Sequence, residues 1–198
     1  MLKGIDISHH NFRSMKDKNE INKFDFVIIK ATEGSTYRDP KCEEWSKIVK
    51  SPTLKGYYHF ARPDNKNSAK AEANNFLSVI LKYIDGETIL ALDVEAGALS
   101  VKNLDDWCLE WCKHVRSATG ITPMIYCSES ECKRFKKCAD FGCGLWVAKW
   151  SILKPKNIAP WHFFAIWQRS DNQIVSGVRC DYNFFNGNSD QYLRYCRN

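Results

Sequence analysis

Long apolar runs are absent from this chain of 198 residues. No stretch approaches the roughly 18 consecutive apolar residues of a membrane-spanning helix, so the sequence predicts no membrane span. A Pro-, Gly- or Ser-rich linker, a low-complexity tract and an internal repeat are also missing, which gives no support for a second domain. The first strand-like segment begins at Leu2 and leaves no room for a signal peptide. We therefore expect residues 1–198 to form one domain that does not associate with membranes.

The main cluster of cysteines lacks the spacing of a structural zinc site as well. The chain has nine cysteines, and an odd number leaves at least one of them unpaired within a monomer. Four of them, Cys127, Cys132, Cys138 and Cys143, cluster in the sequence. Their spacing lacks the short knuckles of zinc sites, so we expect no metal. Cys108 and Cys112 lie on the apolar stripe of a predicted helix, and we expect both to be buried, reduced and inert.

A large excess of one charge is lacking too. The chain has 29 Lys and Arg against 23 Asp and Glu, a net charge of +6, and the basic residues are scattered. This excess suits an anionic partner, and by charge alone nucleic acid and an anionic cell wall fit equally well. No RNA- or DNA-binding motif is present. We therefore expect no nucleic-acid partner, and we expect a monomer.

Strand-like segments alternate with helical ones over most of the chain. Strands are predicted near residues 2–7, 25–31, 55–60, 88–95, 122–127, 144–149, 163–168 and 177–182. Helices are predicted at 67–84 and 101–119, with a weaker one at 40–50. The later strands follow one another with too few residues for full helices between them. The pattern predicts an α/β fold, an irregular TIM-like β/α barrel of about eight strands and fewer than eight helices.

The segment from Ile89 to Glu95 carries the strongest chemical signal. Period-two alternation places Leu90, Leu92 and Val94 on one face of a strand and the remaining residues, including Asp93 and Glu95, on the other. Two carboxylates two residues apart have backbones roughly 6 to 7 Å apart on one side of a sheet. Like charges this close raise one pKa, so one acid can stay protonated beside an ionised partner. Glycoside hydrolysis needs one protonated and one ionised acid. The alternative interpretation is a solvent-exposed strand end, where Asp and Glu only contact water.

Other predicted strands also end in polar and aromatic residues. Asp6 and Asp181 complete a set of four strand-end acids that could converge in one mouth of the barrel. Each of these two acids also suits a turn, where a carboxylate accepts backbone N–H groups. His59 is interpreted as a structural hydrogen-bonding residue. Aromatic residues at strand ends suit stacking on sugar rings and core packing equally well. They are Tyr57, Tyr126, Trp150 and Trp167.

These segments, in this order, resemble the glycoside hydrolase family 25 lysozymes, the Chalaropsis-type N-acetylmuramidases. The resemblance runs nearly end to end and rests on residues 6–8, 29–34, 56–60, 92–95, 167–168 and 181–183. It implies a flattened, irregular β/α barrel as a single catalytic domain over residues 1–198, without a separate cell-wall-binding domain. It also implies cleavage of the β-1,4 bond between N-acetylmuramic acid and N-acetylglucosamine in peptidoglycan, with no metal or organic cofactor.

The resemblance also implies roles for individual residues. Glu95 matches the general acid that protonates the leaving glycosidic oxygen. Asp93 matches the partner that orients the substrate acetamido group or stabilises the developing oxocarbenium ion. Asp6 and Asp181 match the two other site acids. The family pattern favours net retention through the substrate's own N-acetyl oxygen. Further positions match the lining of the groove, namely Lys30, Glu33, Tyr37, Tyr57, Tyr126, Trp150 and Gln168.

The segment His9 to Phe12 departs from the resemblance, because many relatives have an aromatic residue followed by Gln-Gly or Asn-Gly there. Without a signal peptide, we expect an endolysin-like protein that is cytoplasmic until it is released or exported to act on the cell wall. Secretion by another route is the alternative. The main rival function is an inactive barrel that binds glycans as a lectin. A metal-dependent phosphoesterase is disfavoured, because only His9, His10 and His59 lie near predicted strand ends.

Overall fold

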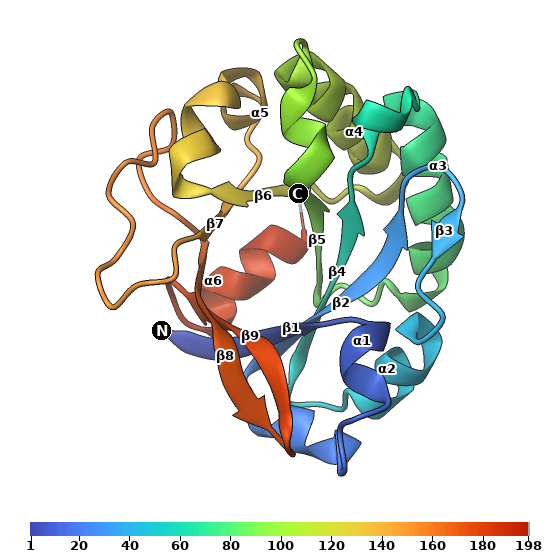
Figure 1. The fold of residues 1–198 in the computed structure, drawn as a ribbon, viewed down its shortest axis with the longest axis vertical. Helices are drawn as coiled ribbons and strands as arrows, with labels where there is room; N and C mark the ends of the chain where they lie inside the picture. Colours follow the sequence, from blue (N-terminus) through green and yellow to red (C-terminus); the bar gives the residue numbers. More distant parts are fainter. Residues whose placement is uncertain (198) are drawn as a thin grey trace.

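A closed β-barrel forms the centre of the computed structural model, which describes residues 1–197 (Figure 1). The strands are β1 (Leu2–Ile7), β2 (Phe26–Glu33), β3 (Tyr37–Arg38), β4 (Leu54–Phe60), β5 (Thr88–Asp93), β6 (Met124–Ser128), β7 (Leu145–Ala148), β8 (Ile166–Val175) and β9 (Val178–Phe185). Their order is β1-β9-β8-β7-β6-β5-β4-β2, and β1 pairs with β2 to close the ring. The short β3 lies at the edge beyond β2. Eight strands therefore make the barrel, as predicted.

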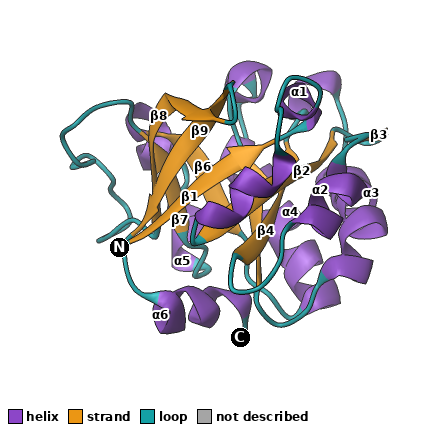
Figure 2. Ribbon diagram, turned by 90° about the horizontal axis from the view of Figure 1, so that it is seen from below, coloured by secondary structure: helices purple, strands orange, loops and turns teal. Residues whose placement is uncertain are grey.

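The helices are unevenly distributed around this barrel. They are α1 (His9–Phe12), α2 (Cys42–Ile48), α3 (Ala69–Ile80), α4 (Leu104–Thr119), α5 (Lys136–Asp140) and α6 (Ser189–Leu193), with short 3₁₀ turns between them. Figure 2 shows α2, α3 and α4 on one side of the strands. On the other side a loop, residues 149–165, joins β7 to β8, and no helix forms in it. The predicted irregular, helix-poor barrel is confirmed.

Period-two alternation separates two apolar clusters on the two faces of the barrel wall. Leu90, Leu92 and Val94 pack outside it, beneath the helices, whereas Ile89 and Ala91 pack inside. This matches the two faces predicted for the segment. The inner face therefore leads along β5 from apolar residues to Asp93 at the carboxyl end of the strand.

The C-terminal segment closes one end of the barrel. Tyr192 of α6 is fully buried, and its hydroxyl donates to the backbone oxygen of Lys55 over 2.9 Å. Its ring lies 5.2 Å from that of Phe185 and 5.6 Å from that of Phe26. These aromatic contacts fill the interior at the amino-terminal end of the parallel strands, and the opposite end holds an open cavity.

The last two strands differ most from the prediction. β8 runs on to Val175, and β9 returns antiparallel to both β8 and β1. Ser176 and Gly177 connect them with φ angles of 46° and 87°. Two successive left-handed residues make a tight hairpin turn whose twist matches that of antiparallel strands. A Ser-Gly pair alone does not predict this turn, because the strands on both sides of it must be known first. Asp181 therefore lies in the middle of β9 and not at its carboxyl end.

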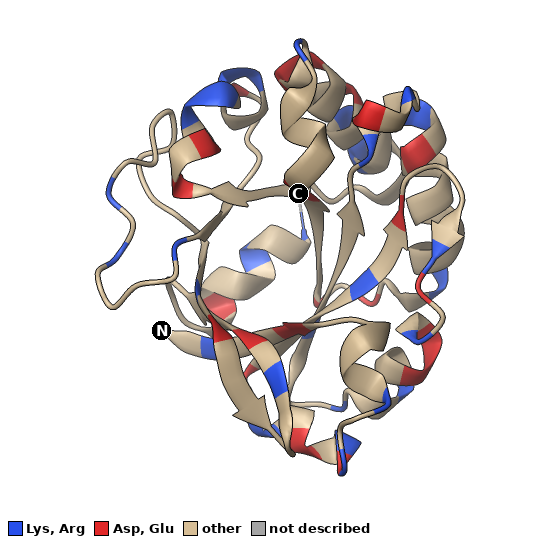
Figure 3. Cartoon of the chain, in the orientation of Figure 1, with Lys and Arg blue, Asp and Glu red and all other residues tan. Residues whose placement is uncertain are grey.

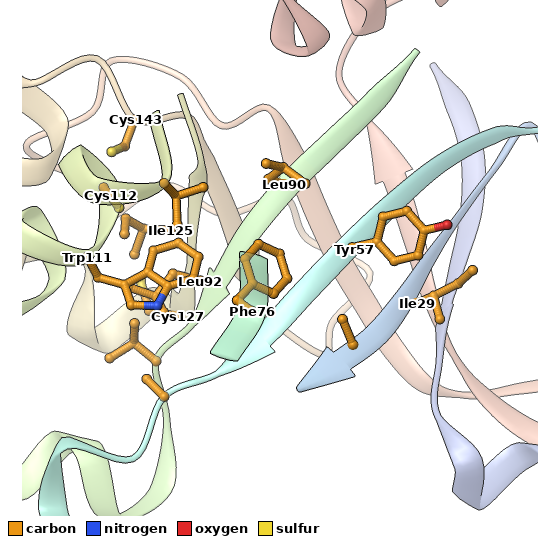
Figure 4. Close-up of a cluster of buried hydrophobic side chains, with 14 of the residues drawn as sticks. Ile29, Tyr57, Phe76, Leu90, Leu92, Trp111, Cys112, Ile125, Cys127 and Cys143 are labelled. Carbon is orange, nitrogen blue, oxygen red and sulfur yellow. The ribbon is translucent and has the colours of Figure 1, made fainter. Parts of the chain in front are cut away.

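The outer cluster also holds the cysteines of α4. Figure 4 shows Trp111 and Cys112 packed beside Leu92, Ile125, Cys127 and Cys143. Cys108 and Cys112 are fully buried and unpaired, as predicted, and burial is the main cause that raises the pKa of each thiol. All nine cysteines lie in the described part of the chain and are free. Their inertness to labelling stays a prediction. In residues 1–197 no helix is long and apolar enough to cross a membrane.

Candidate active site

A cavity of about 250 Å³ opens at the carboxyl ends of the parallel strands. All four predicted acids line it, together with Lys30, Tyr126 and Gln168 of the predicted groove. The other lining residues are Ser8, His10, Tyr58, Phe60 and Trp146. Figure 3 shows that basic residues are spread over the rest of the molecule. The structure thus gathers four carboxyl groups in one mouth of a protein with net positive charge.

Asp6 is fixed at the inner wall by two side-chain amides. Its Oδ2 accepts Asn183 Nδ2 over 2.8 Å and Gln168 Nε2 over 3.1 Å. The indole N–H of Trp146 donates to Asn183 Oδ1 over 2.8 Å, and that of Trp150 donates to Gln168 Oε1 over 3.1 Å. Each indole fixes which end of its amide faces the acid, because an N–H can bind only the amide oxygen. Burial raises the pKa of Asp6, and the two amide hydrogen bonds oppose that rise.

Asp181 lies directly opposite Asp6 on the neighbouring strand, because β1 and β9 are antiparallel and these two residues are in register. Like charges in a cross-strand pair repel each other. Burial, followed by the charge of Asp6, raises the pKa of Asp181 to about 8. The pair therefore keeps a proton at neutral pH.

Asp93 is the most isolated of the four acids. Its side chain is buried, and its Oδ1 has no hydrogen-bond partner among the described residues. Burial, with the charges of Glu95 and Asp6, holds the pKa of Asp93 well above its usual range. An unsatisfied buried polar atom costs about 1–3 kcal/mol of stability. A group that is kept at such a cost is a candidate for contact with a ligand.

Glu95 follows the end of β5 and is the more accessible acid of the Asp93–Glu95 pair. It is half-buried, and burial together with the charge of Asp181 raises the pKa of its carboxyl group. The next residue, Ala96, has a φ of 49°, a left-handed conformation that is unusual for a residue with a Cβ. A 3₁₀ helix begins at Ala96, and Glu95, just before it, lines the cavity. Glu95 also lines a second, more apolar groove.

The second groove has a volume of about 300 Å³ and shares Glu95 and Tyr126 with the acidic cavity. Trp150 lines it with Val94, Leu99 and Tyr126. The Trp150 side chain is 62% exposed although its N–H is fixed to Gln168. Its ring is therefore free to stack on a ligand, and Glu95 stands where the acidic cavity and the apolar groove meet.

Glu33 and Tyr37 lie beside the acidic cavity and do not line it. Glu33 binds Lys30 Nζ over 2.7 Å and Arg62 over 3.1 Å. Burial opposes a low pKa, but these two cations keep the pKa of Glu33 below its usual value. Tyr37 is exposed, and its hydroxyl lies 3.2 Å from His9 Nδ1. Both residues therefore belong to the rim, with Glu33 positioning Lys30.

Tyr57 does not reach the cavity, which corrects its predicted place in the groove. The side chain is fully buried in the outer cluster, and its hydroxyl donates to Ser46 over 2.9 Å (Figure 4). Its neighbour Tyr58 lines the cavity instead. His59 shares the outer face with Tyr57 and bonds to Glu72 and Thr32, so its structural role is confirmed.

The facing of β4 in the structure distinguishes the two tyrosines. Gly56 faces the interior, where an added Cβ would lie 2.6 Å from Ile89, and its face includes Tyr58 and Phe60. The sequence prediction also missed Ser8, His10, Trp146 and Asn183. Asn183 could have been found, because it lies two residues after Asp181 on the same face of β9.

Paired carboxyl groups in a barrel mouth beside the apolar groove are the arrangement that the class of glycoside hydrolases uses. The comparisons with known proteins agree. The sequence profile of "Glycosyl hydrolases family 25" matches residues 5–178, and this chain belongs to that family. The chain is 33% identical to the uncharacterized protein YegX of Escherichia coli (strain K12), over 96% of this chain and 71% of YegX.

Characterised relatives and solved structures extend this result. The chain is 30% identical to the N,O-diacetylmuramidase of Chalaropsis sp, over 83% of this chain and 84% of that protein. Among solved structures, a family GH25 lysozyme from Aspergillus fumigatus superposes with a TM-score of 0.80 and 30% identity, over 100% of this chain and 99% of that one. This chain is therefore a glycoside hydrolase with the lysozyme fold of family 25.

Proposed function

We propose that the acidic cavity hydrolyses the β-1,4 bond between N-acetylmuramic acid and N-acetylglucosamine in peptidoglycan. The convergence of Asp6, Asp93, Glu95 and Asp181 in one cavity is the observation that carries this proposal. Membership of family 25 and the muramidase relatives support the same activity. An inactive lectin would have no use for four acids whose pKa values are all raised by burial.

Glu95 is the proposed general acid. A carboxyl group with a raised pKa keeps its proton at the pH where the enzyme works and can donate it to the leaving oxygen. Its position between the acidic cavity and the apolar groove lets sugars on both sides of the bond reach it. The same carboxylate would then accept a proton from the water that completes hydrolysis.

Asp93 is the proposed partner of the substrate's acetamido group. Its unpaired Oδ1 is a buried acceptor that an amide N–H could satisfy. Such a bond would hold the acetamido oxygen toward the anomeric carbon, so that this oxygen acts as the internal nucleophile and the configuration is retained. Asp6 and Asp181 would add negative charge that favours the developing oxocarbenium ion.

The remaining predicted residues are proposed to hold the glycan. Trp150 and Tyr126 border the apolar groove and would contact sugar rings, while Lys30 and Gln168 border the acids. Glu33 and Tyr37 would act from the rim. In residues 1–197 no group of three or more His, Cys, Asp or Glu side chains is placed to hold a metal ion. We propose a cofactor-free monomer, with residues 1–198 as one catalytic domain that acts on the bacterial cell wall after release or export.

Digestion of purified peptidoglycan, followed by analysis of the new reducing ends, tests this function. We expect reducing N-acetylmuramic acid, and retained anomeric configuration in an early-time NMR spectrum. Reducing N-acetylglucosamine would indicate a glucosaminidase. Binding of the glycan without new ends would indicate the lectin. An inverted product with muramic acid ends would keep the activity and refute the acetamido mechanism.

A further inference from the structure

The loop of residues 149–165 joins β7 to β8 (Figure 1). Its tip carries exposed apolar side chains, and of these only Trp150 has a part in the proposed glycan binding. Ile152 is 81% exposed and Leu153 is 65% exposed, close to Trp150 at 62%. Single exposed apolar residues are ordinary, but a contiguous group marks an interaction surface. We define this tip by residues 150–156.

The tip is held in place at its base. The Glu129 carboxylate accepts the backbone N–H groups of Lys156 and Asn157 and binds Lys149 Nζ over 2.8 Å. Pro155 is buried, and the N–H of Leu153 donates to Ser151 Oγ over 3.0 Å. The apolar side chains therefore face solvent from an anchored loop, which lowers the entropy lost when a partner binds.

The tip also continues the active site. Trp150, its first residue, lines the apolar groove together with Glu95. A sugar bound at Glu95 would therefore lie beside Trp150, and Ile152 and Leu153 follow Trp150 directly in the chain. The partner of the tip is thus a part of the substrate next to the bond that is cut.

The charge of the loop indicates the chemistry of that part. Residues 149–165 include no Asp or Glu, and the ammonium groups of Lys154 and Lys156 make no ion pair within the described chain. Two unpaired cations thus belong to a loop whose Trp150 borders the groove that shares Glu95 with the acidic cavity. An anionic substituent would be repelled by the cavity and attracted by the tip.

We propose that the tip of residues 150–156 binds the peptide that muramic acid carries on its lactyl group, and so selects peptide-bearing glycan. This proposal rests on the proposed muramidase function. Such a peptide combines alanine methyl groups, which suit Ile152 and Leu153, with free carboxylates, which suit Lys154 and Lys156. The peptide is attached to the sugar beside the scissile bond, and the tip begins at Trp150 beside that bond.

The test compares one set of uncrosslinked glycan strands before and after an amidase has removed the peptides. The variants are Ile152→Ser with Leu153→Ser, and Lys154→Glu with Lys156→Glu. We expect each double variant to lose about tenfold in kcat/KM on peptide-bearing strands, equivalent to a few lost contacts, and less than about twofold on bare strands. The loss in the lysine variant should shrink at high salt, because exposed charges are screened.

Ile174→Ser is the matched control, since Ile174 is 57% exposed in β8 and lies outside the tip. It should leave both substrates unaffected. Equal losses on both kinds of strand, or no preference of the wild type for peptide-bearing strands, would overturn the proposal. A different result would assign the tip to a membrane surface instead. In that case the wild type would bind anionic lipid vesicles, both double variants would lose this binding, and their preference between the two kinds of strand would be unchanged. A wild type that cuts neither kind of strand would refute the muramidase function itself.

Discussion

The two ends of the barrel interior are built from the same strands and are opposite in chemistry. The closed end, defined by Phe26, Ile89, Phe185 and Tyr192, is apolar and filled. The acidic end, defined by the four acids of the cavity, is polar and open. On β5 the two ends are only four residues apart, from Ile89 to Asp93. Alternation places both side chains inside the barrel, and the position of each residue along β5 determines the end at which it lies.

This difference separates stability from function. Aromatic contacts at the closed end stabilise the barrel, because this end buries apolar surface and, among the described residues, holds no unpaired buried polar atom. The acidic end buries like charges and leaves Asp93 Oδ1 unpaired, which lowers stability. Substitutions at the closed end should therefore act on folding, and substitutions at the acidic end should act on catalysis.

The largest expected effect is on folding, at the closed end. Phe185→Ala removes a fully buried ring that contacts Tyr192 and Tyr195, and we expect a loss of about 3–5 kcal/mol in the free energy of unfolding. Urea denaturation measures it. At a temperature where the variant is folded, kcat/KM should change less than about threefold, since the site is distant. A large loss of rate in the folded variant would break the comparison.

Glu95→Gln should have the largest effect on catalysis. The amide is nearly isosteric but cannot give a proton to the leaving oxygen, so kcat should fall about a hundredfold or more. Release of reducing ends measures the rate, and thermal unfolding should show a Tm no lower than that of the wild type. Near-normal turnover by a folded variant would contradict the role of Glu95.

The pH dependence of stability should reveal the Asp6–Asp181 pair. Because the folded pKa of Asp181 is about 8 and its ordinary value is 3.8, the folded state binds a proton that the unfolded chain has lost in between. Stability from this residue is therefore present below about pH 4 and is lost as the pH rises toward 8. Urea unfolding measures the free energy of unfolding at pH 5 and at pH 8. The difference between the two values should be smaller for Asp181→Asn than for the wild type. An equal difference would place Asp181 in a solvated environment.

The smallest effects sharpen the comparison at adjacent tyrosines. Tyr57→Phe removes a buried hydrogen bond to Ser46 and should cost about 1 kcal/mol of stability with no change in rate. Tyr58→Phe removes a hydroxyl from the cavity wall and should lower kcat/KM severalfold with little change in stability. Measurements of Tm and kcat/KM for both variants test this difference. The reverse pattern would show that Tyr57, and not Tyr58, faces the cavity.

Much of this arrangement could be predicted from sequence, because alternation in Ile89 to Glu95 determines both faces of the central strand. The four acids converge because residues at one end of a barrel lie close together. Tyr57 was misplaced because Tyr57 and Tyr58 are both aromatic, and only the facing of Gly56 distinguishes them. The length of the β8–β9 hairpin depends on cross-strand pairing with β1, which no local pattern contains.

Asp93→Asn tests the central claim most directly, because this one substitution measures the effect of the acidic end on both stability and catalysis. Removal of a buried acid with an unpaired oxygen should leave the free energy of unfolding at pH 7 equal to or above that of the wild type. In the same variant, release of reducing ends should fall about a hundredfold while glycan binding remains intact. A variant that is less stable and still turns over normally would show that Asp93 serves the fold, and would contradict the account of the acidic end.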